Sequence, residues 1–463
     1  MPVSSTADEI PSDAPPCSPG QLDRILGPEH RALTIGILAV VSLVAFEAMA
    51  VATAMPVAVR DLHGLRFYAW GFSAFLTASL VGMVVSGEVS DRRGPLLPFV
   101  VAVTTFGIGL VLAGLATTMW LFVLGRAIQG FGGGLNIVAL YVVVGRTYPD
   151  ALRPRLFSAM SSAWVLPAIV GPAIAGAVAD ALSWRWVFLA VPPLIAPAVL
   201  LMLPHLTGLG AATEGGSVRR RTLPAVAAAV GVALLQYAGQ RRDVVSLWLV
   251  VGGLALLAPS LPRLLPRGTL RIRRGLPTTI AMRGVLAGAF FGAETFVPLM
   301  LIEERGMATA LAGLTLTGGA VGWSAGSWYQ GRPSTTLSRH RLIQAGTGLV
   351  AVGIAVTALG LWQALPALVA AVGWVVAGLG MGAAMSSVNV VMLGQSREAE
   401  QGFNSAALQV SDALGSIVLI GVAGAIFAGL HNDHGGNAPV FLFIYGLMAA
   451  VAVAGAVVAP RVR

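Results

Sequence analysis

Long apolar runs recur along the whole chain, and they constrain the fold more than any other feature of the sequence. A helix needs about 20 apolar residues to cross the hydrocarbon core of a bilayer. Only 11% of the 463 residues are charged, whereas soluble domains carry roughly 25%. A soluble fold would therefore lack the polar side chains to cover its surface. The sequence predicts an all-α protein with many membrane spans.

The apolar runs fall into groups of six, two and six. The predicted spans lie near residues 33–58, 67–89, 95–117, 119–145, 155–180, 184–204, 223–239, 245–262, 276–302, 308–329, 340–362, 364–393, 402–430 and 438–459. We expect four regions: a disordered cytoplasmic tail (1–31), an N-terminal six-helix bundle (32–204), a cytoplasmic linker with two extra helices (205–275) and a C-terminal six-helix bundle (276–463). Without the middle pair the count is twelve, so fourteen and twelve spans both stay open.

The arginines indicate the orientation of these spans. All 29 basic residues are Arg, and an even number of spans with the N-terminus inside places most of them in inner segments. Such a bias fixes orientation by the positive-inside rule, so we expect both termini in the cytoplasm. The tail lacks the basic start and cleavage site of a secretory signal. Together with the Ala-, Gly- and Arg-rich composition, this predicts a multi-pass protein of a bacterial inner (plasma) membrane.

Missing residue types exclude several kinds of chemistry. Without Lys there is no Walker A loop and no Schiff-base catalysis. The single cysteine, Cys17, allows neither an intrachain disulfide nor a cysteine metal site, and the six His residues show no ligand spacing. We expect no metal, no cofactor and no nucleic-acid partner, and a protein that works as a monomer.

Charge is concentrated in VSGEVSDRRGPLL at 85–97, between the second and third predicted spans. Gly94 and Pro95 predict a tight turn, and Gly87 predicts close helix packing. The segment GEVSDRRG resembles the signature loop of the major facilitator superfamily, which implies that Asp91 latches neighbouring helices during gating. The gating residues predicted in this way are Gly87, Glu88, Asp91, Arg92, Arg93 and Gly94. An ordinary positive-inside loop would explain the arginines but not the two acids.

Two further motifs lie inside apolar spans. LGRAIQGFGGG at 124–134 buries Arg126, where an unpaired cation costs about 2.5 kcal/mol or more, so Arg126 needs a carboxylate, a carbonyl or water. This segment resembles the fourth-span motif of the same superfamily; a role confined to holding helices together is the alternative. PAIVGPAIAG at 167–176 resembles the fifth-span motif of its exporters, with Gly171, Pro172 and Gly176.

The first span supplies a further resemblance. FEAMAVATAMP at 46–56 is similar to a pattern in fourteen-span drug:proton antiporters, an acid followed nine residues later by Pro, here Glu47 and Pro56. That family usually has Asp at the acid. The resemblance implies the major facilitator fold and proton-driven multidrug efflux by alternating access. GAETFVPLM at 292–300 repeats the acid and the Pro in the second half, with Glu294 as the acid.

Three acids lie well inside predicted spans: Glu47, Glu294 and Asp412. Because burial favours the neutral form of a carboxyl group, such acids are candidates for proton coupling. We hypothesise that Glu47 and Glu294 carry protons and that Arg126 tunes them, whereas Asp412 could equally be a hydrogen-bonded helix contact. Arg283 shares a helix with Glu294 but lies about 16 Å from it along the axis, so each needs a partner elsewhere.

Polar and aromatic residues on central spans are candidate walls of a substrate cavity. They are Gln129, Asn136, Tyr141, Trp164, Phe290, Phe291, Phe296 and Asn389. Such side chains give adaptable contact to a hydrophobic or cationic small molecule, although aromatic residues in spans also face lipid or pack in the core.

The predicted function is proton-coupled antiport of drugs or amphiphilic small molecules across a lipid bilayer, with the proton gradient as the driving force. An exporter dedicated to one endogenous metabolite, or a lipid-handling member, is the alternative. A non-transporting receptor or scaffold would have little reason to combine Glu47, Asp91 and Arg126. An enzyme is disfavoured because the sequence has no HExxH pattern and no cluster of His, Asp and Glu that would hold a metal.

Overall fold

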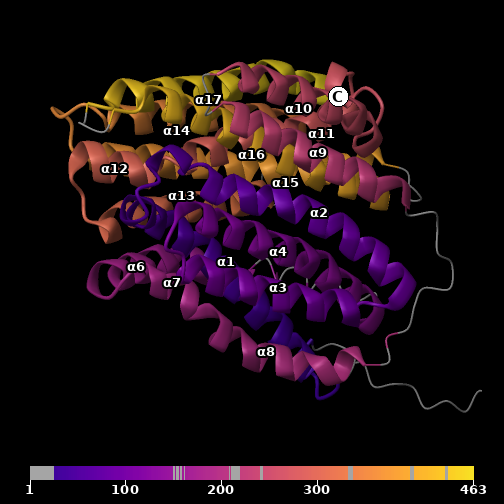
Figure 1. Ribbon diagram of the computed structural model, residues 1–463. Coiled ribbons are helices and arrows are strands. Elements are labelled where there is room, and N and C mark those ends of the chain that lie inside the picture. The colour runs from indigo at the N-terminus through magenta and orange to yellow at the C-terminus, as the bar shows by residue number, and fades with distance from the viewer. Residues whose placement is uncertain are drawn as a thin grey trace, which may run out of the picture.

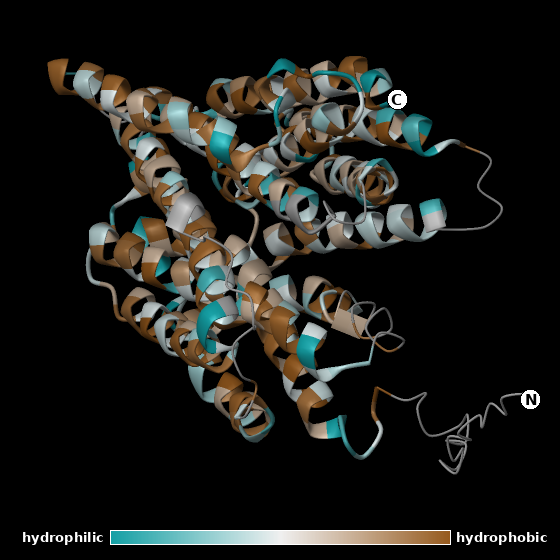
Figure 2. Cartoon of the chain, turned by 90° about the vertical axis from the view of Figure 1, so that its right-hand side faces the viewer, coloured by the Kyte–Doolittle hydropathy of each residue, from teal (hydrophilic) through white to brown (hydrophobic). Residues whose placement is uncertain are grey.

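The computed structural model describes residues 25–149, 152, 156, 159–160, 162–207, 209, 219–239, 243–331, 337–396, 401–432 and 436–463. Within these residues the chain forms helices and no β-strand, which confirms the all-α prediction. Of these helices, 11 are long and apolar enough to cross a membrane. A helix suits this solvent because it satisfies its own backbone hydrogen bonds. Hydrophobic residues cover the helices along much of their length (Figure 2).

The helices follow the predicted runs in order. The first part of the chain forms α1 (Arg31–Asp61), η1 (Leu65–Phe67), α2 (Trp70–Arg93), α3 (Leu96–Gly114), α4 (Met119–Thr147), α6 (Val165–Ala181), α7 (Arg185–Leu189) and α8 (Val191–Leu206). The middle part forms α9 (Arg219–Ala238), α10 (Val244–Leu264) and η2 (Thr269–Arg271). The last part forms α11 (Leu276–Glu294), α12 (Val297–Arg305), α13 (Thr309–Gly331), α14 (Arg339–Leu359), α15 (Leu368–Gln395), α16 (Gln401–Leu430), α17 (Ala438–Val458) and η4 (Ala459–Val462). The choice between twelve and fourteen spans stays open.

Two predicted spans are each broken into two helices. The run at 276–302 contains α11 and α12, which are separated at Thr295 and Phe296. Pro298 is the second residue of α12 and has no N–H to donate to the carbonyl of Glu294, so the helix cannot continue regularly through this point. The run at 184–204 breaks between α7 and α8, where two prolines follow Val191.

Glycines bring the long helices into close contact. A Cβ added to Gly134 of α4 would lie 2.0 Å from the backbone oxygen of Ser79 in α2. A Cβ added to Gly378 of α15 would lie 2.0 Å from the backbone oxygen of Gly319 in α13. The same type of glycine contact thus joins α2 to α4 and α13 to α15, because small residues let helices approach closely where the hydrophobic effect does not drive association.

Helices from the first and last parts of the chain meet along two lines, α6 against α13 and α2 against α16. In the first, a Cβ on Gly176 would lie 2.3 Å from the Cα of Ala310. In the second, α9 also packs against both α2 and α16 (Figure 1). Gln236 of α9 accepts a hydrogen bond from Ser73 of α2 and donates one to the carbonyl of Ile417 in α16. The middle part of the chain therefore touches both the first and the last part.

Candidate functional site

A buried ion pair joins α1 to α4. Arg126 Nη1 donates to Glu47 Oε1 at 2.7 Å, and the two side chains are 4% and 1% exposed. Arg126 Nε donates to the backbone oxygen of Gly71 in α2 at 2.8 Å, and Nη1 also donates to Gln129 Oε1 at 2.5 Å. The guanidinium lies over the Phe75 ring, 4.7 Å from its centroid, in a cation–π contact. Glu47 is thus the carboxylate that the burial of Arg126 requires.

The helical spacing of α4 explains part of this arrangement. Arg126 and Gln129 are three residues apart and therefore lie on one face of the helix. Gln129, a candidate cavity wall, instead lies fully buried beside the guanidinium. Removing one partner of a buried pair costs about 3–5 kcal/mol because the other charge is left uncompensated. The pair therefore holds α1, α2 and α4 together as well as placing an acid in the membrane interior.

A second ion pair lies in the last part of the chain. Arg283 Nε of α11 donates to Asp412 Oδ1 of α16 at 2.6 Å. Its terminal nitrogens donate to Asn389 Oδ1 of α15 at 3.1 Å and to Gln409 Oε1 of α16 at 3.4 Å. The side chains of Arg283 and Asp412 are 14% and 25% exposed, so this pair is more open than the first.

In the part of the chain that the structure describes, Glu294 has neither an arginine nor an amide as a partner. It is the last residue of α11 and borders the break before α12. Within the described residues its partly buried side chain makes no hydrogen bond and no ion pair. Its neighbour Thr295 accepts a hydrogen bond from the Tyr68 hydroxyl through the backbone oxygen, at 2.7 Å in a buried site. The candidate site therefore contains one acid that is paired and buried, one that is paired and partly open, and one that is unpaired.

The predicted gating loop is largely helical. The second span was predicted to end near residue 89, but α2 continues to Arg93. The turn begins at Gly94, whose φ is +81°, as the sequence predicted. Glu88 pairs with Arg92 one helical turn later at 3.2 Å and accepts a hydrogen bond from Thr222 of α9 at 2.5 Å. The side chain of Asp91 lies outside the described residues, so its role as a latch stays a prediction.

Gly87 does not have the packing role that the sequence suggested. A Cβ added there would meet only Val138, at 4.0 Å, which is ordinary contact. The fifth-span motif does bring helices close: Gly176 contacts α13, and a Cβ on Gly171 would lie 3.3 Å from Met49 of α1. Pro172 lies inside α6, and its carbonyl oxygen is 3.1 Å from where a Cβ on Gly313 would stand.

The other cavity candidates divide by burial. Phe290 is 2% exposed and stacks on Trp374, with ring centroids 4.7 Å apart. Phe291 packs edge-on against the Phe290 ring. Phe296 is fully buried against Tyr68. These three rings therefore belong to a packed core.

Three other cavity candidates are either exposed or have a buried polar atom without a partner among the described residues. Tyr141 and Trp164 are 44% and 39% exposed. Asn136 is buried, and within the described residues its Oδ1 has no partner. These three side chains could therefore contact a substrate at the surface of the helices or after a change of state.

Sequence reasoning missed the contact between Tyr68 and Thr295, which links the first and last parts of the chain at the predicted outer end. Near it, Arg60 pairs with Glu303 at 3.5 Å, and the Tyr68, Phe296 and Phe427 rings pack together. Pro298 was the available signal, because it frees backbone groups one turn earlier. Nothing in the sequence pointed to Tyr68 as their partner.

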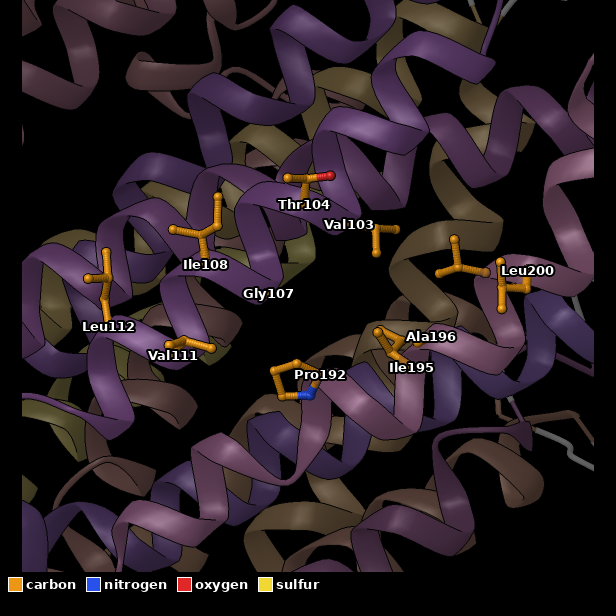
Figure 3. A pocket seen from close by; sticks show the side chains of 11 residues that line it. Val103, Thr104, Gly107, Ile108, Val111, Leu112, Pro192, Ile195, Ala196 and Leu200 are labelled. Carbon is orange, nitrogen blue, oxygen red and sulfur yellow. The ribbon is translucent and has the colours of Figure 1, made fainter.

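A cavity of about 570 Å³ lies away from these charged groups, between α3 and α8. Val103, Gly107 and Ile108 line one side, and Pro192 and Ile195 line the other (Figure 3). None of the predicted site residues borders it. Its apolar lining suits contact with lipid tails rather than charge transfer.

Comparison with known proteins gives the family context of this arrangement. Residues 37–420 match the Major Facilitator Superfamily. Multidrug resistance protein 3 of Bacillus subtilis (strain 168) is 29% identical over 173 residues, but the match covers 37% of this chain and only 34% of that protein. A protein of Mycobacterium tuberculosis (strain CDC 1551 / Oshkosh) named as a probable multidrug-efflux transporter is 25% identical over 427 residues, 87% of this chain and 88% of that protein.

Solved structures agree on the fold. A POT family transporter in complex with 5-aminolevulinic acid superposes with a TM-score of 0.68 at 15% sequence identity, covering 96% of this chain and 99% of that one. At this identity the likeness concerns the arrangement of helices alone.

Proposed function

The chain belongs to the Major Facilitator Superfamily, and we propose that it is a proton-coupled antiporter that exports drugs or other amphiphilic small molecules by alternating access. The names of the relatives support efflux of drugs. Secondary transporters of this general kind place substrate and coupling-ion sites between two repeated halves near the bilayer midplane.

The unpaired carboxyl of Glu294 is the observation that carries this proposal. An isolated charge within the membrane is costly, so this side chain favours a bound proton or a bound cation over an empty, charged state. A group that holds one or the other, but not both, couples two opposed fluxes. Glu47 is less suited to that exchange, because Arg126 already neutralises it at 2.7 Å.

The surroundings of Glu294 support a link to gating. The next residue, Thr295, accepts the hydrogen bond from Tyr68, which comes from the first part of the chain. A change in the charge of Glu294 therefore acts beside a contact that must break if the two six-helix regions separate at the predicted outer end. Small residues form the contacts between α6 and α13, so the two regions can rotate against each other there without large side chains interlocking.

Gradient-driven efflux in everted membrane vesicles tests the proposal. We expect Glu294→Gln to lower the initial rate of proton-driven dye efflux about tenfold or more, equivalent to about 1.4 kcal/mol, while the purified protein still binds the dye. Glu29→Gln is the matched control, because Glu29 is exposed and precedes α1. Full coupled transport by Glu294→Gln would refute the assignment.

A dedicated exporter of one endogenous compound is the second candidate. A susceptibility panel in a pump-deficient bacterial host separates the two: protection against several unrelated drugs supports the first, and protection against none supports the second.

A further inference from the structure

The Arg283 cluster is more exposed than the Glu47–Arg126 pair. The first pair is sealed, with side chains 4% and 1% exposed, whereas Arg283 and Asp412 are 14% and 25% exposed. Neutral amides from Asn389 and Gln409 complete the cluster, and both of these residues are exposed. A charged group arriving from outside the protein core can therefore reach this pair.

The geometry leaves the outer edge of the guanidinium weakly held. Asp412 binds Nε at 2.6 Å, but the two terminal nitrogens face only amide oxygens, at 3.1 and 3.4 Å. Two terminal N–H groups side by side match the two oxygens of a carboxylate, and such a charged bidentate contact is stronger than a bond to a neutral amide. Asn389 and Gln409 can turn aside or donate through their own NH₂ groups.

The cluster also faces the other six-helix region. Asp412 and Gln409 lie on α16, which packs against α2 of the first part of the chain. Ala413 and Leu414, next to Asp412, belong to one apolar cluster with Leu80 of α2. The Arg283 cluster therefore lies beside the contact between the two regions, where a transported molecule would pass.

We propose that the Arg283–Asp412 cluster binds the polar group of a zwitterionic amphiphile, with the substrate carboxylate on the terminal nitrogens of Arg283 and its cationic group beside Asp412. This inference deepens the proposed transport function and rests on it. The cluster is electrically neutral, so a zwitterion gains an attractive contact at each end. A purely cationic molecule meets Arg283, and a purely anionic one meets Asp412, at close range and in a poorly screened site.

A pair of rhodamine dyes tests the role of the carboxylate directly. The free carboxylic acid is a zwitterion at neutral pH, and its methyl ester is a cation of nearly the same shape. Binding of each dye is measured by fluorescence anisotropy on the full-length protein in lipid nanodiscs, at one pH and one salt concentration and without an ion gradient. Wild type is expected to bind the free acid more tightly than the ester.

Arg283→Gln is expected to weaken binding of the free acid about tenfold or more, equivalent to about 1.4 kcal/mol, and to leave the ester bound at least as tightly because a repulsive charge is gone. Arg341→Gln is the matched control, since Arg341 is exposed in the same part of the chain. Arg283→Lys keeps the charge and the pairing with Asp412 but loses the planar fork, so intermediate binding of the acid is expected. This variant also serves if Arg283→Gln does not fold.

Equal losses for both dyes, no loss for either, or no binding of the acid by wild type would overturn the inference. Its failure is separable from failure of the proposed function. Gradient-driven efflux of the ester without any binding of the acid rejects the zwitterion site alone. Arg283-dependent binding of the acid without gradient-driven efflux rejects proton coupling alone.

Discussion

Replacing Arg126 with Gln should destabilise the protein strongly. The change removes the charge 2.7 Å from Glu47, the bond to the Gly71 carbonyl at 2.8 Å and the contact with the Phe75 ring. Gln is too short to reach all three partners from the same backbone position. The carboxylate of Glu47, only 1% exposed, is then left without a counter-charge in the membrane interior.

The expected loss follows from the burial of the pair. Breaking one partner of a buried ion pair costs about 3–5 kcal/mol, so Arg126→Gln and Glu47→Gln should each lower the free energy of unfolding by about that amount. The double variant with both substitutions carries neither charge. Its free energy of unfolding should therefore fall by less than the sum of the two single losses. Arg92→Gln is the control, because Arg92 is 55% exposed and an exposed helical pair contributes about 0.3–0.5 kcal/mol.

Unfolding in mixed detergent micelles, followed by tryptophan fluorescence, measures these free energies. A coupling of about 0.5–3 kcal/mol between the two positions is typical of residues in contact and would support the buried pair. Strictly additive single losses, or an Arg126→Gln loss as small as that of Arg92→Gln, would show that Glu47 is not the partner that neutralises Arg126.

Two further predictions concern contacts between helices. Tyr68→Phe removes the buried hydrogen bond to the Thr295 carbonyl and should cost the closed outer contact about 1 kcal/mol; spin-label distances across the predicted outer end should broaden, and an unchanged distribution would count against a gating contact. Gly378→Ala places a Cβ 2.0 Å from the Gly319 backbone oxygen and should lower folded yield and thermal stability in detergent. Gly348→Ala, where nothing lies within 4 Å, should leave both unchanged, and equal behaviour of the two variants would contradict the close packing of α13 on α15.

Family and fold were both accessible from the sequence. The motifs around Arg126 and Gly171 lie on helices that the apolar runs had located, and the match to the Major Facilitator Superfamily confirms the resemblance. Local chemistry explains this success. Apolar length fixes a membrane helix wherever it occurs, and Pro298 ends regular hydrogen bonding whatever surrounds it.

Electrostatic partners were less accessible. The sequence required separate partners for Arg283 and Glu294, since about 16 Å of helix lies between them, but it could not say which. In the structure Arg283 pairs with Asp412, and Glu294 has no partner in the described part of the chain. The same limit applied to Arg126, whose burial demanded a counter-charge without identifying Glu47.

The sequence by itself therefore determined the helices, their order and which side chains would be costly to bury. Only the tertiary structure decided which buried charges were neutralised, because the partner of each charge depends on how helices far apart in sequence pack. Arg126 and Glu47 are 79 residues apart, and Arg283 and Asp412 are 129 apart. The glycine contacts that set the helix distances depend on both surfaces at once, and one helix read alone contains only half of that information.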